Sequence, residues 1–183
     1  MEESIVKALV VDDYEPFRRF ACSTLAKRQN VQVIGEASDG LAAVRKAEEL
    51  KPDLIVLDIG LPTLNGIEVA RQVRNLCPEC KILFMSQVSS AAVAQEAFSL
   101  GAMGYVVKAY ARRELSAAVE AVCQGRQFVS KGLSGHSFAD TTDPHASRFR
   151  TQAGSPAAGT EKKEIASSHE VELYSDEACF LLV

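Results

Sequence analysis

The chain has 183 residues, 47% of them hydrophobic and 24% charged, which suits one well-packed domain with an appendage. Its 20 basic and 24 acidic side chains give a net charge of -4, so the chain has no overall attraction for nucleic acid or an anionic membrane. No apolar run reaches the roughly 20 residues of a membrane span, and the acidic start differs from a secretory signal. The odd number of cysteines, five, indicates a reduced, cytoplasmic protein.

Composition divides the chain near Lys131. Residues 1–131 hold 16 acidic and 16 basic side chains, whereas the remainder holds 8 acidic, 4 basic and all three histidines. Residues 132–168 are rich in Gly, Ser, Thr, Pro and Asp, which predicts a flexible, largely disordered linker, because such a composition buries too little apolar surface to fold. Residues 169–183 alternate like a strand and then begin an apolar helix, so we expect a short strand-and-helix stub that could be a truncated second domain.

Residues 1–131 alternate short apolar runs with helical patterns. The runs that predict strands are Ile5–Val11, Val31–Ala37, Leu54–Leu57, Ile82–Met85 and Tyr105–Val107. Runs that are apolar at nearly every position are typical of parallel strands covered on both faces. The intervening segments repeat apolar residues every three or four positions and are bounded by Pro16, Pro52, Pro78, Gly101 and Gly125. We therefore expect an α/β fold: a doubly wound, five-stranded parallel sheet, flavodoxin-like with strand order 2-1-3-4-5, flanked by five helices.

Polar side chains stand where four of these strands end: Asp12 and Asp13, Asp58, Ser86, and Lys108. In the expected strand order these positions converge at one edge of the sheet, where doubly wound folds carry their sites. Three carboxylates close together repel one another, and Mg²⁺, which prefers oxygen ligands, would relieve that repulsion. An added ammonium and hydroxyl suit a phosphoryl group held beside the metal.

The spaced motifs resemble those of a response-regulator receiver domain, the phosphoacceptor part of a two-component system. They are VVDD at residues 10–13, IVLDIGLP at 55–62 followed by Asn65-Gly66, Ser86, and GYVVK at 104–108. The resemblance covers about residues 4–128. It implies that Asp58 is the phosphorylated aspartate, and that Asp58, Asp13 and the Gly60 backbone carbonyl bind Mg²⁺.

The resemblance also assigns supporting roles to four other side chains. It implies that Asp12 helps to hold the metal through water, and that Lys108 pairs with the phosphoryl group. Ser86 would sense the phosphoryl group, and Tyr105 would swing inward as the switch aromatic. The domain would act on no other substrate: it would catalyse only its own phosphorylation and dephosphorylation.

The partners follow from the same resemblance. A sensor histidine kinase or phosphotransfer protein would supply the phosphoryl group. An output partner would read the face formed by the fourth strand, fourth helix, fifth strand and fifth helix, and the fold allows for a phosphorylation-dependent dimer. Residues 132–168 lack both a helical pattern and a basic stripe, so we expect no direct DNA binding, and no membrane association.

Two residues depart from the family pattern. Ala109 follows Lys108 where many receivers have proline, so a cis peptide is not expected there. Gln87 follows Ser86 where receivers place a small residue, which predicts an altered lifetime of the phosphoryl group.

Other interpretations have weaker support in the sequence. The domain could be a pseudo-receiver that acts as a phosphorylation-independent scaffold. Cys77 and Cys80 form a CxxC pair that could serve redox exchange or zinc. A haloacid dehalogenase-type phosphatase would need a second aspartate where this chain has Gly60. The stub at 169–183 faintly resembles the start of a MEDS/DcmR-type sensory domain. We expect the chain to be a stand-alone or truncated receiver.

Overall fold

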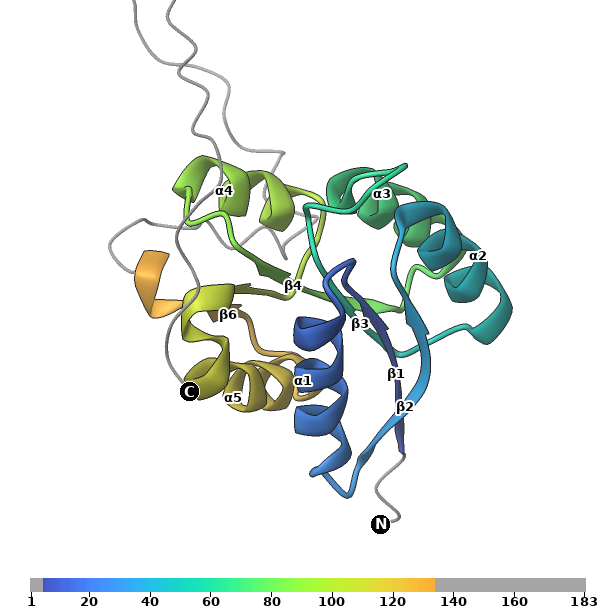
Figure 1. The fold of residues 1–183 in the computed structure, drawn as a ribbon, viewed down its shortest axis with the longest axis horizontal. Coiled ribbons are helices and arrows are strands. Elements are labelled where there is room, and N and C mark those ends of the chain that lie inside the picture. The colour runs from blue at the N-terminus through green and yellow to red at the C-terminus, as the bar shows by residue number, and fades with distance from the viewer. Residues whose placement is uncertain (1–4, 134–183) are drawn as a thin grey trace, which may run out of the picture. The chain divides into compact units, whose positions relative to one another are not determined.

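The computed structural model describes residues 5–133, in which strands and helices alternate as expected (Figure 1). The strands are β1 (Val6–Val11), β2 (Val31–Ala37), β3 (Leu54–Leu57), β4 (Lys81–Ser86), β5 (Gly104–Val107) and β6 (Phe128–Val129). The α-helices are α1 (Glu15–Ala26), α2 (Gly40–Leu50), α3 (Gly66–Leu76), α4 (Ala91–Ser99) and α5 (Ala111–Cys123). Two short 3₁₀ helices, η1 (Lys108–Tyr110) and η2 (Lys131–Leu133), follow β5 and β6. Within this part of the chain, no helix has the length and apolarity of a membrane span.

Local sequence signals explain where the helices begin and end. Pro16 lies in the first turn of α1, where its missing N–H costs no helical hydrogen bond. The Asn65 side chain caps α3 by accepting a hydrogen bond from the Glu68 N–H at 3.0 Å. Gly101 and Gly125 follow α4 and α5 with φ angles of 82° and 76°, the left-handed conformation that glycine adopts without strain.

The sheet has six strands, and the prediction of five was one strand short. The order is β2-β1-β3-β4-β5-β6 with every pair parallel, so the predicted order 2-1-3-4-5 is present with β6 added at one edge. β6 has only two residues, too few to show an apolar pattern in the sequence. Backbone pairing defines it instead: the Phe128 N–H donates to the Met103 carbonyl at 3.0 Å and the Ser130 N–H to the Tyr105 carbonyl at 2.9 Å.

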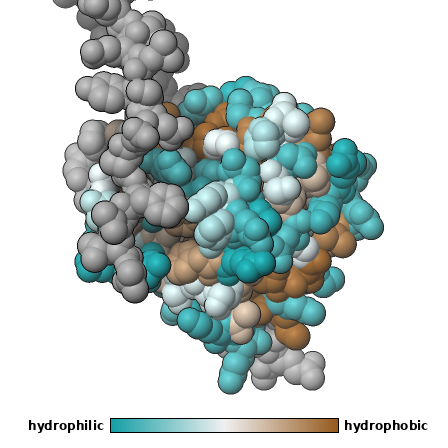
Figure 2. Space-filling model, in the orientation of Figure 1, coloured by the Kyte–Doolittle hydropathy of each residue, from teal (hydrophilic) through white to brown (hydrophobic). Residues whose placement is uncertain are grey.

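Two apolar layers cover the two faces of the sheet. Helices α1 and α5 lie on one face, and α2, α3 and α4 on the other (Figure 1). Leu57 and Phe84 pack in the layer with α2, α3 and α4, whereas Leu83 and Met85 pack in the layer with α1 and α5. Because both faces are buried, the strands need apolar residues at nearly every position, as the sequence pattern indicated. The face drawn in Figure 2 is mostly hydrophilic outside, with its brown surface in separate patches.

The described structure continues past the predicted domain boundary at residue 131. Leu133 is only 2% exposed and belongs to the core. The predicted linker at 132–168, apart from its first two residues, and the stub at 169–183 lie outside the described residues. Those two domain assignments, and the MEDS resemblance of the stub, stay predictions.

Candidate functional site

A cavity of about 420 Å³ opens where β1, β3, β4 and β5 end. Its lining residues are Asp13, Tyr14, Asp58, Ile59, Gly60, Ser86, Gln87, Val88 and Lys108. The structure therefore brings together the residues that the sequence singled out at four separate strand ends. Asp12 and Tyr105 are fully buried and are not part of the lining.

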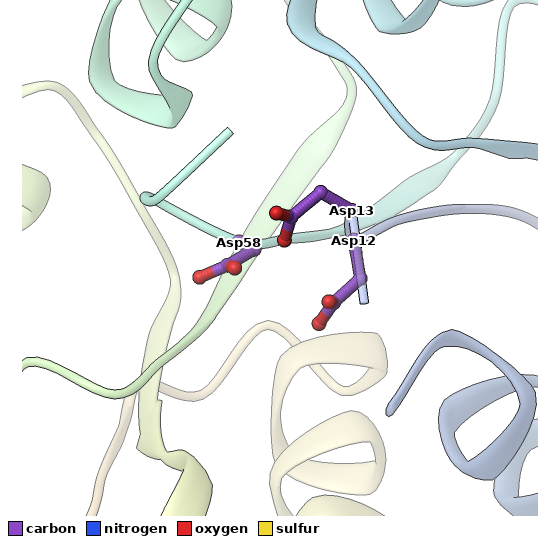
Figure 3. A group of neighbouring side chains, drawn as sticks. All are labelled: Asp12, Asp13 and Asp58. Atoms are coloured by element: carbon purple, nitrogen blue, oxygen red, sulfur yellow. The ribbon is translucent and has the colours of Figure 1, made fainter. Parts of the chain in front are cut away.

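Three carboxylates cluster at one end of this cavity. One oxygen each from Asp12, Asp13 and Asp58 lies within 4.8 Å of the other two. Figure 3 shows that Asp12 and Asp13 follow one strand and Asp58 follows another, with the three side chains turned into a shared space. Asp12 and Asp58 are buried, at 0% and 5% exposed, whereas Asp13 is exposed to solvent. The cluster therefore has a closed inner side and an open outer side.

The Lys108 ammonium lies between the two buried carboxylates. Its Nζ is 2.8 Å from Asp12 Oδ2 and 2.8 Å from Asp58 Oδ2, and it stands 4.9 Å above the centre of the Phe17 ring. Burial alone would lower the pKa of Lys108, but hydrogen bonds to Asp12 and Asp58 outweigh burial and raise the pKa above its usual value. Lys108 is therefore charged, and it is the cation closest to the cluster.

Burial has the larger effect on Asp12. It raises the pKa of the Asp12 carboxyl above its usual value, although the Lys108 contacts and the Tyr14 N–H act in the opposite direction. Oδ1 accepts a hydrogen bond from the Tyr14 N–H at 3.0 Å, whereas Oδ2 is buried and forms an ion pair with the Lys108 ammonium at 2.8 Å. The Lys108 ammonium thus contacts two of the three carboxylates, and negative charge remains in excess.

A hard divalent cation fits this set of donors. The cluster offers only oxygen ligands, which is what Mg²⁺ takes in proteins, and Mg²⁺ retains water where protein ligands are few. Asp13, Asp58 and Gly60 all line the open cavity, so they could reach such an ion directly. In residues 5–133 this is the one group of three or more Asp, Glu, His or Cys side chains close enough to hold a metal.

Ser86 and Tyr105 meet at the backbone of Val88, in the loop between β4 and α4. The Val88 N–H donates to Ser86 Oγ at 3.2 Å, and the Tyr105 hydroxyl donates to the Val88 carbonyl at 2.8 Å. Tyr105 is 0% exposed, so its ring already points inward in this structure. Burial also raises the pKa of its hydroxyl, which keeps that hydroxyl protonated as a donor.

Sequence reasoning did not identify Val88 and Tyr14 as parts of the site. Both contribute backbone N–H groups, and Val88 also contributes its carbonyl. Every residue type carries these groups, so no side-chain pattern reveals them. Gln87, which the sequence did single out, is exposed and lines the cavity. No peptide bond in residues 5–133 is cis, which confirms the expectation for Ala109.

The CxxC pair does not resemble a redox or zinc site. Cys77 and Cys80 are buried free thiols, and the Cys77 thiol donates to the Ala47 carbonyl at 3.3 Å. Burial raises the pKa of Cys80 to about 12, whereas a redox-active or metal-binding cysteine needs its thiolate. Neither thiol belongs to a group of metal ligands in the described part of the chain.

Comparisons with known proteins lead to one family. The chain matches the response regulator receiver domain over residues 8–120, more than half of its length. Response regulator GacA from Pseudomonas aeruginosa is 27% identical over 181 residues, which cover 96% of this chain and 82% of GacA. Response regulator protein VraR from Staphylococcus aureus is 31% identical over 120 residues, so the match covers 66% of this chain but only 57% of VraR.

Solved structures agree with the sequence comparisons. A crystal structure of a two-component response regulator of the LuxR family, from Aurantimonas sp. SI85-9A1, superimposes with a TM-score of 0.67 and 34% identity. The superposition covers 71% of this chain and 93% of that one. Fold, motifs and cavity thus lead to one assignment: this chain belongs to the family of response regulator receiver domains.

Proposed function

We propose that this receiver domain is a phosphorylation-dependent signalling switch, with Asp58 as the phosphoacceptor and Mg²⁺ as its cofactor. The observation that supports this most is the placement of the Asp58 carboxylate. It opens onto the 420 Å³ cavity, contacts Lys108 at 2.8 Å, and has two other carboxylates within 4.8 Å. A scaffold has no use for three carboxylates crowded together beside one ammonium, so the phosphorylation-independent alternative leaves the site unexplained.

Asp58 is oriented for nucleophilic attack. The Ile59 N–H donates to Oδ1 at 2.7 Å and Lys108 contacts Oδ2, which together fix the plane of the carboxylate. In the proposed reaction a carboxylate oxygen attacks phosphorus, and the bond from phosphorus to the donor's histidine nitrogen breaks, leaving an acyl phosphate on Asp58. Bound Mg²⁺, held by Asp13, Asp58 and the Gly60 carbonyl and through water by Asp12, would offset the negative charge of the phosphoryl group.

Lys108 and Ser86 then respond to the new group. The Lys108 ammonium can leave Asp58 Oδ2 for a phosphoryl oxygen, and the Ser86 hydroxyl, whose oxygen accepts from the Val88 N–H, can donate its proton to the same group. Because the Val88 carbonyl also accepts a hydrogen bond from the Tyr105 hydroxyl, a change at Ser86 can be transmitted to β5 through the loop that contains Val88. We infer that the surface formed by β4, α4, β5 and α5 carries the output. Attack of water on the acyl phosphate returns Asp58 to its free form.

The proposed partners rest on the family. Response regulators receive phosphoryl groups from histidine kinases, and we propose a sensor histidine kinase or a phosphotransfer protein as the donor here. The absence of direct DNA binding stays a prediction: no comparison supports it, and it concerns residues mostly outside the described part of the chain. A phosphorylation-dependent dimer likewise stays a proposal.

Beryllofluoride, a stable mimic of the phosphoryl group, tests this assignment. We expect wild-type protein to bind beryllofluoride only when Mg²⁺ is present, measured by fluorine NMR, and we expect Asp58→Asn to abolish binding. Asp39→Asn is the matched control, because Asp39 caps α2 and asparagine caps a helix equally well. Binding that persisted in Asp58→Asn would contradict the assignment.

A further inference from the structure

The residues that follow α5 run back along the edge of the sheet. We call Phe128–Leu133, drawn in orange in Figure 1, the exit segment. Its first two residues form β6, in which Val129 pairs with Tyr105 of β5. The Ser130 N–H then donates to the Tyr105 carbonyl at 2.9 Å. The exit segment is thus bonded directly to the residue proposed as the switch aromatic.

Helix α5 holds the exit segment through one buried carboxylate. Glu114 is 6% exposed, and its Oε2 accepts a hydrogen bond from the Ser130 hydroxyl at 2.5 Å while Oε1 accepts one from the Lys131 N–H at 3.2 Å. Ser130 is itself 0% exposed. Burying a carboxylate is costly unless its oxygens are hydrogen-bonded, so these two bonds tie Glu114 to the exit segment specifically.

Packing connects the end of the exit segment both to the cluster around Tyr105 and to η1, the short helix that begins at Lys108. Leu133 is 2% exposed and lies in the same buried cluster as Tyr105. A side-chain carbon added to Gly132 would lie 2.7 Å from the Tyr110 ring, so that ring rests directly on the Gly132 backbone. Tyr110 is the last residue of η1, whose first residue is Lys108. A movement of Lys108 or of Tyr105 would therefore displace the exit segment.

We propose that the exit segment is a strap that holds the Tyr105 ring inward, with Glu114 as the positioning residue that fastens it. Tyr105 is 0% exposed in a buried cluster that also contains Leu133 and packs against Val129, and its hydroxyl donates to the Val88 carbonyl. The strap couples the state of the phosphoryl site to Phe128–Leu133, the last residues that the structure describes. The coupling to the phosphoryl site rests on the proposed function of Asp58. The claim that the exit segment keeps Tyr105 inward does not depend on that function.

Fluorine NMR of the full chain labelled with fluorotyrosine tests whether the exit segment holds the Tyr105 ring inward. The chain has four tyrosines, so Tyr105→Phe assigns the resonance of interest. We expect Glu114→Gln and Ser130→Ala each to move the Tyr105 resonance toward its solvent-exposed position. Glu120→Gln is the matched control, because Glu120 lies on the same helix with its side chain 50% exposed and paired with Arg28. A Tyr105 resonance that stayed unchanged in both folded variants would overturn the strap.

A double-mutant cycle distinguishes loss of the hydrogen bond between Glu114 and Ser130 from a general loss of packing. If Glu114 acts through Ser130, the combined variant Glu114→Gln/Ser130→Ala should shift the Tyr105 resonance no further than the larger single change. Additive shifts would show that the two residues act separately and would overturn the role of Glu114 as fastener.

Beryllofluoride affinity tests the coupling. Because coupling is reciprocal, releasing the strap should weaken Mg²⁺-dependent beryllofluoride binding by about fivefold or more, and Glu120→Gln should not change it. Unchanged affinity in a variant whose Tyr105 resonance has moved would overturn the coupling. If wild-type protein itself fails to bind beryllofluoride, the proposed function fails, and the tyrosine measurements still decide whether the strap exists.

Discussion

Lys108 sets the electrostatic balance of the site at the scale of single residues. It is 5% exposed and within 2.8 Å of two carboxylates, while a third lies nearby. In so closed an environment a charge left without its partner is far more costly than it is at the surface. The same ammonium is therefore both the structural counterion of the resting site and the group proposed to receive the phosphoryl oxygens.

Replacing Lys108 by methionine should expose this dual role. The change leaves Asp12 and Asp58 buried without their cation, and we expect a loss of about 3 kcal/mol or more in the free energy of unfolding. Millimolar Mg²⁺ should restore part of that loss, because the ion supplies the missing positive charge. Urea denaturation of wild type and Lys108→Met, each with and without Mg²⁺, measures both effects. Equal stability of the two proteins without Mg²⁺ would contradict the charge balance described here.

Gln87 should modestly lengthen the lifetime of the phosphoryl group. Its side chain is exposed, and it lines the same cavity as Asp58, so we expect it to obstruct the approach of water to Asp58. We expect Gln87→Ala to shorten the lifetime of the acyl phosphate by less than tenfold, a barrier change below about 1.4 kcal/mol. The decay of phosphorylated protein after removal of the donor gives the rate. An identical decay in both proteins would exclude a role for Gln87.

At the scale of elements, helix α3 begins directly against Asp58, the proposed phosphoacceptor. A side-chain carbon at Gly66 would lie 2.0 Å from the Asp58 backbone carbonyl, so the first turn of α3 can approach β3 only with glycine at this position. At Gly60, by contrast, the added carbon would be 3.8 Å from Asp58 Oδ2, an ordinary contact. The two glycines flank the same aspartate, and only Gly66 is required by close packing.

Alanine substitutions at these two glycines should therefore differ in their cost. We expect Gly66→Ala to destabilise the fold by about 2 kcal/mol, typical of forcing atoms into a packed interior, and Gly60→Ala to cost much less. Thermal or urea unfolding of the two variants side by side makes the comparison. A Gly66→Ala protein as stable as Gly60→Ala would mean that α3 and β3 are not in the close contact seen here.

The Cys80 thiol, just before β4, should make stability depend on alkaline pH. Burial raises the pKa of this thiol from 9.0 to about 12, so the folded state keeps its proton where the unfolded state loses it. The stability contributed by the protonated thiol is full below pH 9.0 and is lost as pH rises from 9.0 to about 12. The slope for one proton is at most about 1.4 kcal/mol per pH unit.

Unfolding free energies of wild type and Cys80→Ala, measured between pH 8 and pH 11, test whether the Cys80 thiol causes this loss of stability. Wild type should lose more stability across that interval than Cys80→Ala, which has no thiol to ionise at this position. Parallel profiles for the two proteins would show that the Cys80 thiol titrates normally in the folded state and that α3 and β4 do not bury it.

On the scale of the whole molecule, alternation of buried strands and helices predicted most of the architecture. Apolar runs such as Leu54–Leu57 are strands because helices cover both faces, and the parallel order then brings Asp12, Asp58 and Lys108 to one edge. What the sequence did not reveal depends on backbone groups and distant pairing. β6 is defined by two backbone hydrogen bonds, to Met103 just before β5 and to Tyr105 within it. The role of Glu114 appears only once the chain returns to the edge of the sheet.

Intact-mass spectrometry after incubation with acetyl phosphate or phosphoramidate tests the central claim most directly. We predict that wild-type protein gains one phosphoryl group in the presence of Mg²⁺, gains none in EDTA, and that Asp58→Asn gains none in either condition. The Asp39→Asn control should behave like wild type, because Asp39 caps α2 and is not part of the carboxylate cluster. A phosphoryl group on Asp58→Asn, or none on folded wild-type protein that binds Mg²⁺ and beryllofluoride, would contradict the assignment of Asp58 as the phosphoacceptor.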